Sequence, residues 1–410
     1  MNGCDCDSTK ERLLSYEEAI SQLLTSAQPL PDNDKVKTED ALGRVLAVTL
    51  SSAQDVPPLD NSAMDGYAVA SQDVSFAGTC LPVSQRICAG DMGHPLTPGT
   101  AARIFTGAPI PQNADAVIMQ EQCERSKDQV TFMLPASAGQ NIRRAGEDIS
   151  TGDEILQQGV CLRAQELGLA ASIGLSELPV HRRVKAGLFF TGDELVEPGK
   201  KLEPGQIYDS NRFTLLGLLQ TLGCEVVDLG VVADNLPSTK QAIMQATERA
   251  DVVITSGGVS VGEEDHVRIA LEQLGKLQFW RIAMKPGKPV AFGQVNGTPF
   301  FGLPGNPVSV FVTFCLFASP FIKKMQGRAR LQARAITVKA NFNRSAGTRR
   351  EYLRAQLLDD NGQCCANIYP HQGSGVLTST SWADGLVVTP IGKKIQQGDR
   401  VEYLPFTELL

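Results

Sequence analysis

The sequence has no hydrophobic run long enough to cross a membrane and no surplus of positive charge. The most apolar segment, residues 308–322, contains Pro320 and is shorter than the roughly 20 residues that a bilayer span requires. The 410 residues carry a formal net charge of −7, which argues against non-specific binding to nucleic acid. We therefore expect neither a membrane nor a nucleic acid as a partner.

Cysteine and histidine do not occur in the arrangements that hold zinc. The ten cysteines form no CxxC pair, and the four histidines stand alone. Without the spacing of a tetrahedral site, a zinc centre is not expected. The first twelve residues, MNGCDCDSTKER, lack the basic and apolar parts of a secretory signal. We therefore expect a cytoplasmic protein whose thiols stay reduced.

The first 180 residues predict two modules, one inserted into the other. Helices are expected near residues 16–24 and 164–173, where apolar residues recur with helical spacing. Between them lie short apolar segments separated by Gly and Pro, which are typical of a small β-rich module. We expect a linking domain (residues 1–50 and 150–180), whose N-terminal helix packs on the following domain, and an inserted β-rich domain (residues 51–149).

Residues 181–330 alternate between apolar strands and helices. Strands are expected at 184–190, 225–231, 251–255, 277–282, 289–294 and 298–302, and helices at 211–222, 238–250, 264–274 and 307–325. Asp209, Ser210 or Asn211 would cap the first helix, and Ser238 the second. This alternation predicts a three-layer α/β/α domain with a mostly parallel sheet.

Residues 331–410 return to short strands with Gly and Asn turns, which predicts a small C-terminal β-barrel or sandwich. The whole chain is thus expected to be an α/β multidomain protein.

The stretch Asp251–Gly275 carries the clearest chemical signal. A buried strand, Val252–Ile254, runs into the glycine-rich turn SGGVSVG and then into a helix. Free N–H groups in such a turn form a cradle for an anion. Glu263, Glu264 and Asp265 follow, and carboxylates accept a phosphate nearby when a divalent cation lies between them. The turn predicts a phosphorylated ligand with Mg²⁺, although an ordinary turn with acidic helix-capping residues fits the same pattern.

Other polar groups follow the remaining strands of the expected sheet. Carboxylates occur in Thr191–Glu194 and at Asp234, lysines occur in Lys285–Pro289, and the turn Gly302–Pro307 opens the last helix. In parallel sheets, ligands bind outside the carboxyl ends of the strands. Oxygen ligands suit Mg²⁺ and lysines suit an oxyanion, so these loops together predict a functional site.

Nine motifs in this order resemble one family, the molybdopterin molybdenumtransferases of the MoeA type, which are similar to the C-terminal domain of gephyrin. The motifs are DNSAMDGYAV, FTGAPIP, AVIMQE, QNIRRAGEDI, TGDEL, GQIYDSNR, DVVITSGGVSVGEEDH, KPGKP and GLPGNPVS. The resemblance runs from about residue 15 to 405. It implies four domains, an elongated homodimer with a site shared between subunits, and synthesis of molybdenum cofactor. Molybdate would be inserted into adenylylated molybdopterin, with Mg²⁺-assisted release of AMP.

The resemblance also implies roles for individual residues. Asp234 and Asp265 would be metal carboxylates with Glu194 near them, and Asp65, Thr106 and Asp148 would complete the catalytic site from the partner subunit. The substrates would be held by Ser256, Gly257, Gly258, Ser260, Lys285, Lys288, Pro304, Pro307, Arg354 and Ser374. A separate molybdopterin adenylyltransferase would supply the substrate, and molybdoenzymes or their chaperones would accept the product.

Two positions depart from the family pattern. Arg281 stands where a lysine is expected, and Asn235 stands where a second aspartate often follows Asp234.

Two other functions fit parts of the sequence. An adenylyltransferase that uses ATP would share the TSGGVSVG turn, and a non-catalytic scaffold is permitted by the similarity to gephyrin. Tungstate could also replace molybdate, because the two oxyanions have nearly the same size and charge.

Overall fold

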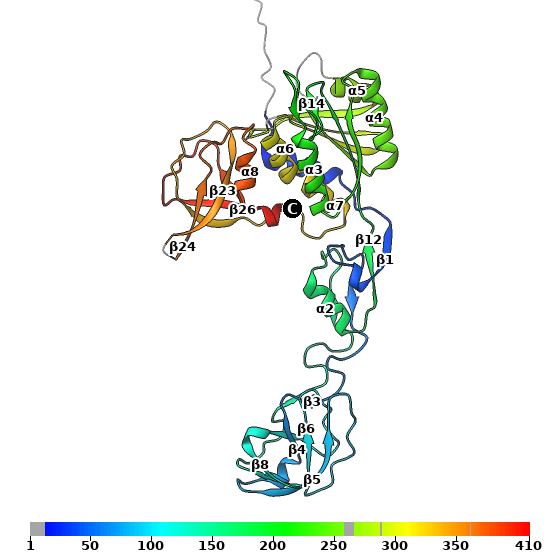
Figure 1. Ribbon diagram of the computed structural model, residues 1–410, viewed down its shortest axis with the longest axis vertical. Helices are drawn as coiled ribbons and strands as arrows, with labels where there is room; N and C mark the ends of the chain where they lie inside the picture. The colour runs from blue at the N-terminus through cyan, green and yellow to red at the C-terminus, as the bar shows by residue number, and fades with distance from the viewer. Residues whose placement is uncertain (1–12, 258–265, 288, 361) are drawn as a thin grey trace, which may run out of the picture.

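The computed structural model describes residues 13–257, 266–287, 289–360 and 362–410. The molecule is elongated: an α/β sheet and a C-terminal barrel lie at one end, and a separate β-sheet lies at the other (Figure 1). A slender module connects the two ends. The two ends therefore present separate surfaces to solvent or to a partner.

Six strands form the α/β sheet in the order β16-β13-β17-β21-β20-β18. Their bounds are β13 (Lys185–Thr191), β16 (Glu225–Val232), β17 (Val252–Ser256), β18 (Gly275–Arg281), β20 (Pro289–Val295) and β21 (Thr298–Leu303). The first four strands in the order are parallel, and β20 runs antiparallel to both of its neighbours. The sheet is therefore mostly parallel, as the alternation of strands and helices predicts.

Strand side chains alternate between two apolar clusters, one on each face of the sheet. Phe189, Val253 and Phe300 pack with α4 (Leu236–Arg249) and α5 (His266–Leu274). Leu188, Ile254 and Phe301 join the other cluster. That cluster also contains buried residues of α1 (Tyr16–Ser26), α3 (Ser210–Thr221), α6 (Pro307–Thr313) and α7 (Ser319–Met325), and Figure 1 shows the two groups of helices on either side of the sheet.

The expected cap of α4 was wrong. The side chain of Asn235, not of Ser238, accepts a hydrogen bond at the start of the helix, and its donor is the main-chain N–H of Ser238 at 2.9 Å. Asn235 has the extended backbone of an N-cap, with φ −145° and ψ 156°. Asp209 caps α3, as predicted, and accepts from the N–H of Arg212 at 3.1 Å.

The last helix of the α/β unit is the most apolar part of the chain. It runs from Pro307 to Met325, with a π-helical turn at Phe314–Ala318 between α6 and α7. Against the expectation from the sequence, this helix is long and apolar enough to cross a membrane, but 89% of its most apolar part is buried inside the protein. Its composition is therefore that of a core helix.

Two pairs of antiparallel strands build the connecting module. β1 (Asn33–Lys37) pairs with β12 (Glu177–His181), and β2 (Leu50–Ser51) pairs with β11 (Glu154–Leu156). The helix α2 (Ala164–Ser172) covers a small cluster that includes Leu46, Leu162 and Leu178.

The distal sheet has the strand order β7-β4-β6-β5-β9-β8. Its strands are β4 (Gly66–Val69), β5 (Cys80–Ile87), β6 (Ala101–Ile104), β7 (Ala116–Met119), β8 (Cys123–Ser126) and β9 (Gln129–Phe132). A short pair, β3 (Asn61–Ser62) with β10 (Ile142–Arg143), lies beside it. Every strand of this sheet comes from between the two halves of the connecting module.

The C-terminal strands form a closed five-stranded barrel. Its strands are β22 (Ile336–Ala340), β23 (Arg350–Asp360), β24 (Gln363–Ile368), β25 (Gly385–Thr389) and β26 (Arg400–Pro405). The sheet closes because β25 pairs with both β26 and β23. This closure decides between the barrel and the sandwich that the sequence left open. The short strand β19 (Met284–Lys285) pairs in parallel with β23 and joins the barrel to the α/β unit.

Candidate functional site

Two turns meet at the carboxyl ends of β17 and β21. Ser256 is buried at the end of β17, and Gly257 takes φ +84°, a conformation that favours glycine. The N–H of Gly257 donates to the carbonyl of Leu303 at 3.1 Å. A Cβ built on Gly305 would lie 3.7 Å from the Cα of Gly257, so the two glycines lie close to each other. The predicted residues Gly258 and Ser260 lie outside the described part of the chain.

Asn211 bridges these turns, a role that the sequence did not reveal. Its Nδ2 donates to Ser256 Oγ at 3.1 Å and to the carbonyl of Gly305 at 2.8 Å. Its Oδ1 is buried, and no described residue forms a hydrogen bond with it. The sequence offered Asn211 only as one of three possible caps of α3, and Asp209 takes that role.

Asp209 lies next to this bridge and is almost completely buried. Burial raises the pKa of Asp209 above its ordinary value, and hydrogen bonding and charge from Arg212 offset only part of this effect. One carboxylate oxygen accepts from the N–H of Arg212. Asp209 Oδ2 and Asn211 Oδ1 are buried, and neither has a hydrogen-bond partner among the residues that the structure describes.

Acidic side chains follow the neighbouring strands. Glu194 comes after β13 and Asp234 after β16, and both are exposed at the same edge of the sheet. A Cβ on Gly192 would lie 2.5 Å from Glu194 Oε2, so this carboxylate lies over the Gly192 backbone. No group of three metal-binding side chains occurs within the described residues, and the predicted third acid, Asp265, lies outside them. Exposed carboxylates suit Mg²⁺, which binds through one or two carboxylates and keeps several waters.

A lysine reaches the same region from β19. Lys285 Nζ lies 3.2 Å from Glu351 Oε1, and Glu351 also accepts from Arg344 at 2.8 Å. Burial disfavours the charge of Glu351, but hydrogen bonds from Arg344 and Lys285 hold its pKa below the ordinary value. Glu351 thus positions Lys285, whose side chain remains 47% exposed. Lys288 lies outside the described residues.

Arg354 is placed differently from the anion-binding role that the family resemblance implies. It is only 1% exposed, and its guanidinium donates to Ser379 Oγ at 3.0 Å and to the carbonyl of Gly373 at 3.1 Å. Burial lowers the pKa of Arg354 to about 10. These bonds hold the loop 371–375, in which the carbonyl of Ser374 accepts from the N–H of Val308 at 3.0 Å. The loop is thereby fixed against the start of α6, next to the predicted residues Pro304 and Pro307.

The remaining predicted residues lie toward the other end of the molecule. Asp65 accepts from both the N–H and the hydroxyl of Thr106, each at 2.8 Å. These hydrogen bonds lower the pKa of Asp65. Asp148 is exposed, and its N–H donates to the carbonyl of Val56 at 3.0 Å. Within one chain, the distal sheet that carries Asp65 and Thr106 lies far from the turns at β17 and β21 (Figure 1).

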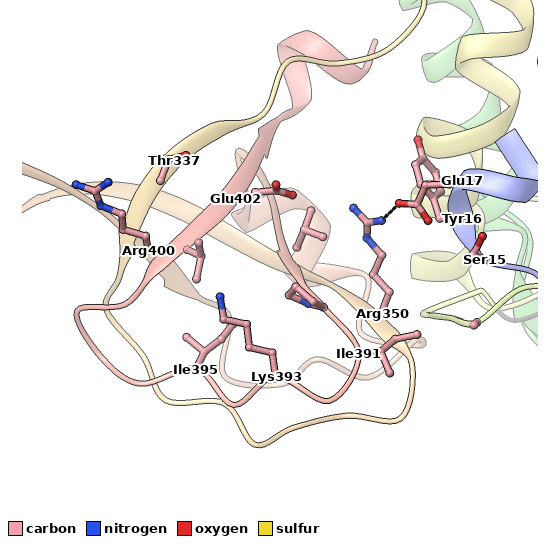
Figure 2. A pocket seen from close by; sticks show the side chains of 14 residues that line it. Ser15, Tyr16, Glu17, Thr337, Arg350, Ile391, Lys393, Ile395, Arg400 and Glu402 are labelled. Atoms are coloured by element: carbon pink, nitrogen blue, oxygen red, sulfur yellow. Dashed lines mark hydrogen bonds and ion pairs between the residues drawn. The ribbon is translucent and has the colours of Figure 1, made fainter. Parts of the chain in front are cut away.

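A cavity of about 540 Å³ lies at a third place, between the start of α1 and the barrel. Figure 2 shows Arg350 pointing toward Glu17, with which it forms an ion pair, while Lys393 and Arg400 extend from the barrel. None of the predicted site residues that the structure describes lines this cavity. The polar rim at the carboxyl ends of the strands remains the candidate site, because Glu194, Asp234 and Ser256 lie at the ends of neighbouring parallel strands there.

Three protein-family models match nearly the whole chain. They are described as the MoeA N-terminal region (domain I and II), matching residues 14–174, a probable molybdopterin binding domain, matching residues 187–324, and the MoeA C-terminal region (domain IV), matching residues 338–406. The matches follow the chain in the order of the quoted motifs.

Curated relatives are similar over most or all of their length. A molybdopterin molybdenumtransferase of Haemophilus influenzae is 40% identical over 405 residues, which cover 97% of this chain and 100% of the relative. A molybdopterin molybdenumtransferase of Nostoc sp. is 36% identical, covering 91% of this chain and 88% of the relative. The crystal structure of the molybdopterin biosynthesis moeA protein of Pyrococcus horikoshii matches with a TM-score of 0.84 and 30% identity, over 96% of this chain and 100% of that chain.

Proposed function

Because the chain belongs to the molybdopterin molybdenumtransferases, enzymes of molybdenum cofactor biosynthesis, we propose that it inserts molybdate into adenylylated molybdopterin and releases AMP. In this reaction water would cleave the phosphoanhydride bond between AMP and the pterin phosphate, and the two dithiolene sulfurs of the pterin would replace two oxygen ligands of molybdate, which leave as water. No cysteine of the protein is needed as a nucleophile. The contact between the Ser256–Gly257 turn and the Pro304–Pro307 turn carries this proposal, because it creates one rim for both substrates.

Each substrate has its own set of groups at this rim. Ser256, Gly257, Gly258 and Ser260 would cradle the pterin phosphates through main-chain N–H groups and hydroxyls. Lys285 and Lys288 would neutralise molybdate, a tetrahedral dianion, beside Pro304, Pro307 and Ser374. Arg354 would act on the same oxyanion by holding the loop 371–375 in place, since its guanidinium bonds to that loop.

Mg²⁺ would be held by Asp234 and Asp265, with Glu194 near them. When bound, the ion would supply a positive charge that offsets the charge of the pyrophosphate. The position of Glu194 and Asp234 after adjacent parallel strands supports this assignment.

The site would be completed by a second copy of the chain. Asp65, Thr106 and Asp148 would come from the partner subunit of a homodimer, and the distance between the two ends of one chain supports this arrangement (Figure 1). Each subunit would comprise a linking domain (residues 1–50 and 150–180), an inserted domain (51–149), a three-layer α/β/α domain (181–330) and a C-terminal domain (331–410).

The substrate and product require partner proteins. A separate molybdopterin adenylyltransferase would supply adenylylated molybdopterin. Molybdoenzymes or their chaperones would receive the finished cofactor. These exchanges would take place in the cytoplasm.

The proposal is tested by AMP release from adenylylated molybdopterin, measured anaerobically with Mg²⁺ and with or without micromolar molybdate. We expect AMP to appear only with molybdate, together with cofactor that activates a molybdoenzyme. AMP release that did not depend on molybdate would make the protein a hydrolase of the linkage. Absence of AMP under both conditions would also contradict the proposal.

A further inference from the structure

We propose that Asn211 is a positioning residue that fixes the two ligand-binding turns relative to each other. The inference rests on the proposed function, because it assumes that the Ser256–Gly257 turn and the Pro304–Pro307 turn hold the substrates together. Asn211 itself would not need to touch either substrate.

The geometry makes Asn211 the side-chain link between these turns. One amide group donates to Ser256 Oγ in the first turn and to the carbonyl of Gly305 in the second. The main chains are joined at the strand ends, where Ser256 pairs with Leu303 and Gly257 N–H donates to the Leu303 carbonyl. The amide of Asn211 adds a bond to Gly305, two residues beyond this pairing, and so ties the second turn to the end of β17.

Helix stability does not account for this side chain. The cap of α3 is Asp209, and the helix is anchored in the core by Leu215, Leu218 and Leu219. Asn211 also buries an oxygen, Oδ1, that has no partner within the described part of the chain, and a buried acceptor without a partner is unfavourable for the folded state. An alanine would avoid this penalty and has the highest helix propensity. The two hydrogen bonds donated by Nδ2 are therefore the property of Asn211 that we connect with function.

Two substitutions separate the donor from the other properties of the residue. Asn211→Ala removes both contacts. Asn211→Asp keeps the shape but places an acceptor opposite the Gly305 carbonyl, while the Ser256 hydroxyl can still donate to it. Because a displacement of about 1 Å can reduce catalysis roughly 100-fold, we expect kcat to fall by about tenfold to 100-fold in both variants.

Gln326→Ala provides the matched control. In the wild-type protein, Gln326 Nε2 donates to the carbonyl of Leu222 at 2.7 Å, and the residue is 5% exposed. Like Asn211 Oδ1, Gln326 Oε1 has no hydrogen-bond partner among the described residues. Gln326 follows α7 and contacts the end of α3, away from both turns. It therefore reproduces the loss of a buried amide without affecting the site.

The experiment measures kcat and KM for AMP release, the Tm, and hydrogen exchange of the unliganded full-length protein. We expect Asn211→Ala to lower kcat and to speed exchange at residues 256–257 and 303–305, while Gln326→Ala lowers the Tm with activity within twofold of wild type. Unchanged exchange in the turns, or equal losses of activity in both variants, would overturn the proposal. If the wild-type protein releases no molybdate-dependent AMP, the proposed function fails, and the exchange result still decides whether Asn211 fixes the turns.

Discussion

The Asp65–Thr106 pair shows how one residue can set the charge of another. Two hydrogen bonds from Thr106 favour the ionised carboxylate and lower the pKa of Asp65. A carboxylate with a lowered folded-state pKa contributes stability above its unfolded pKa, and that contribution is lost as the pH falls through the folded pKa. Asp65 is therefore expected to remain an anion under conditions where an ordinary aspartate begins to protonate.

Thr106→Val should raise the pKa of Asp65 toward its ordinary value. The substitution removes the hydroxyl donor and leaves the main-chain donor, so the acid limb of kcat/KM should move to higher pH while the plateau stays within a few fold. Carboxyl NMR of Asp65 measures the pKa directly. Thr100→Val is the control, because that hydroxyl bonds only to the Thr97 carbonyl and to Ser84 in the same sheet. An unchanged Asp65 pKa would contradict the assigned cause.

Lys285→Ala should raise the molybdate concentration needed for half-maximal AMP release. Removing a charged hydrogen-bond donor costs about 1.5–3 kcal/mol, so a shift of roughly tenfold or more is expected. Glu351 would keep its partner Arg344, and the barrel should remain folded. Lys339→Ala, at a half-buried lysine of the barrel that bonds Gln363, should leave the requirement unchanged. An unchanged requirement in Lys285→Ala would place the oxyanion elsewhere.

At the scale of elements, the turn after β19 depends on one glycine. Gly287 takes φ +89°, and a Cβ there would lie 2.3 Å from Thr313 Cγ2 in α6. Gly287 thus allows the lysine-bearing turn to lie directly on the helix that begins at Pro307. The packing joins the predicted oxyanion-binding residues to the end of β21.

Gly287→Ala should destabilise the protein more than Gly297→Ala. Both glycines have positive φ, and replacing either should cost about 1 kcal/mol through the backbone. A Cβ added to Gly297 would meet no atom within 4 Å, whereas overlap at Gly287 should add about 1–3 kcal/mol. The free energy of unfolding from denaturant titration measures both losses. Equal losses would show that the turn at Gly287 moves away from α6 at little cost.

Most elements of the α/β unit were predictable because their patterns are strong and local. The strand expected at 225–231 runs from Glu225 to Val232, and the helix expected at 211–222 runs from Ser210 to Thr221. The strand β24 was not predicted. Its sequence, Gln-Cys-Cys-Ala-Asn-Ile, has no clear alternation, and it is held in place by its neighbours β23 and β22. Barrel closure likewise depends on pairing between distant segments, which a local pattern does not contain.

The site was predictable in composition but less so in geometry. Motifs identified the family, and the resemblance is confirmed by the full-length relatives. Whether a polar residue faces a ligand or holds a loop depends on tertiary contacts. Arg354 carries the charge that an oxyanion needs, yet its guanidinium is bonded inside the protein. Asn211 lies in a segment that suggests only helix capping, and its bridge spans 94 residues of sequence to Gly305.

At the scale of the whole molecule, the predicted residues divide between its two ends. Asp65 and Thr106 belong to the distal sheet, while Ser256 and Lys285 belong to the α/β unit near the barrel (Figure 1). A homodimer that pairs the distal sheet of one copy with the rim of the other would unite them. In a two-fold symmetric dimer this contact occurs twice, so each dimer would contain two composite sites.

Mixing two defective variants tests this arrangement. Asp65→Asn removes a proposed catalytic carboxylate from the distal end of the molecule. Lys285→Ala removes a proposed molybdate-binding lysine from the rim. In a mixed dimer, one site contains both substitutions and the other site contains neither. About half of the dimers are mixed after subunit exchange, and each mixed dimer has one intact site out of two. Exchange should therefore restore about one quarter of wild-type activity at low molybdate. Asp65→Asn mixed with Asp65→Ala is the matched control: both changes remove the same carboxylate at the distal end, and every site of a mixed dimer keeps one defect. Recovery in the first mixture alone would establish a shared site, whereas no recovery after exchange has been verified by mass spectrometry of tagged subunits would mean that each site is built from a single chain.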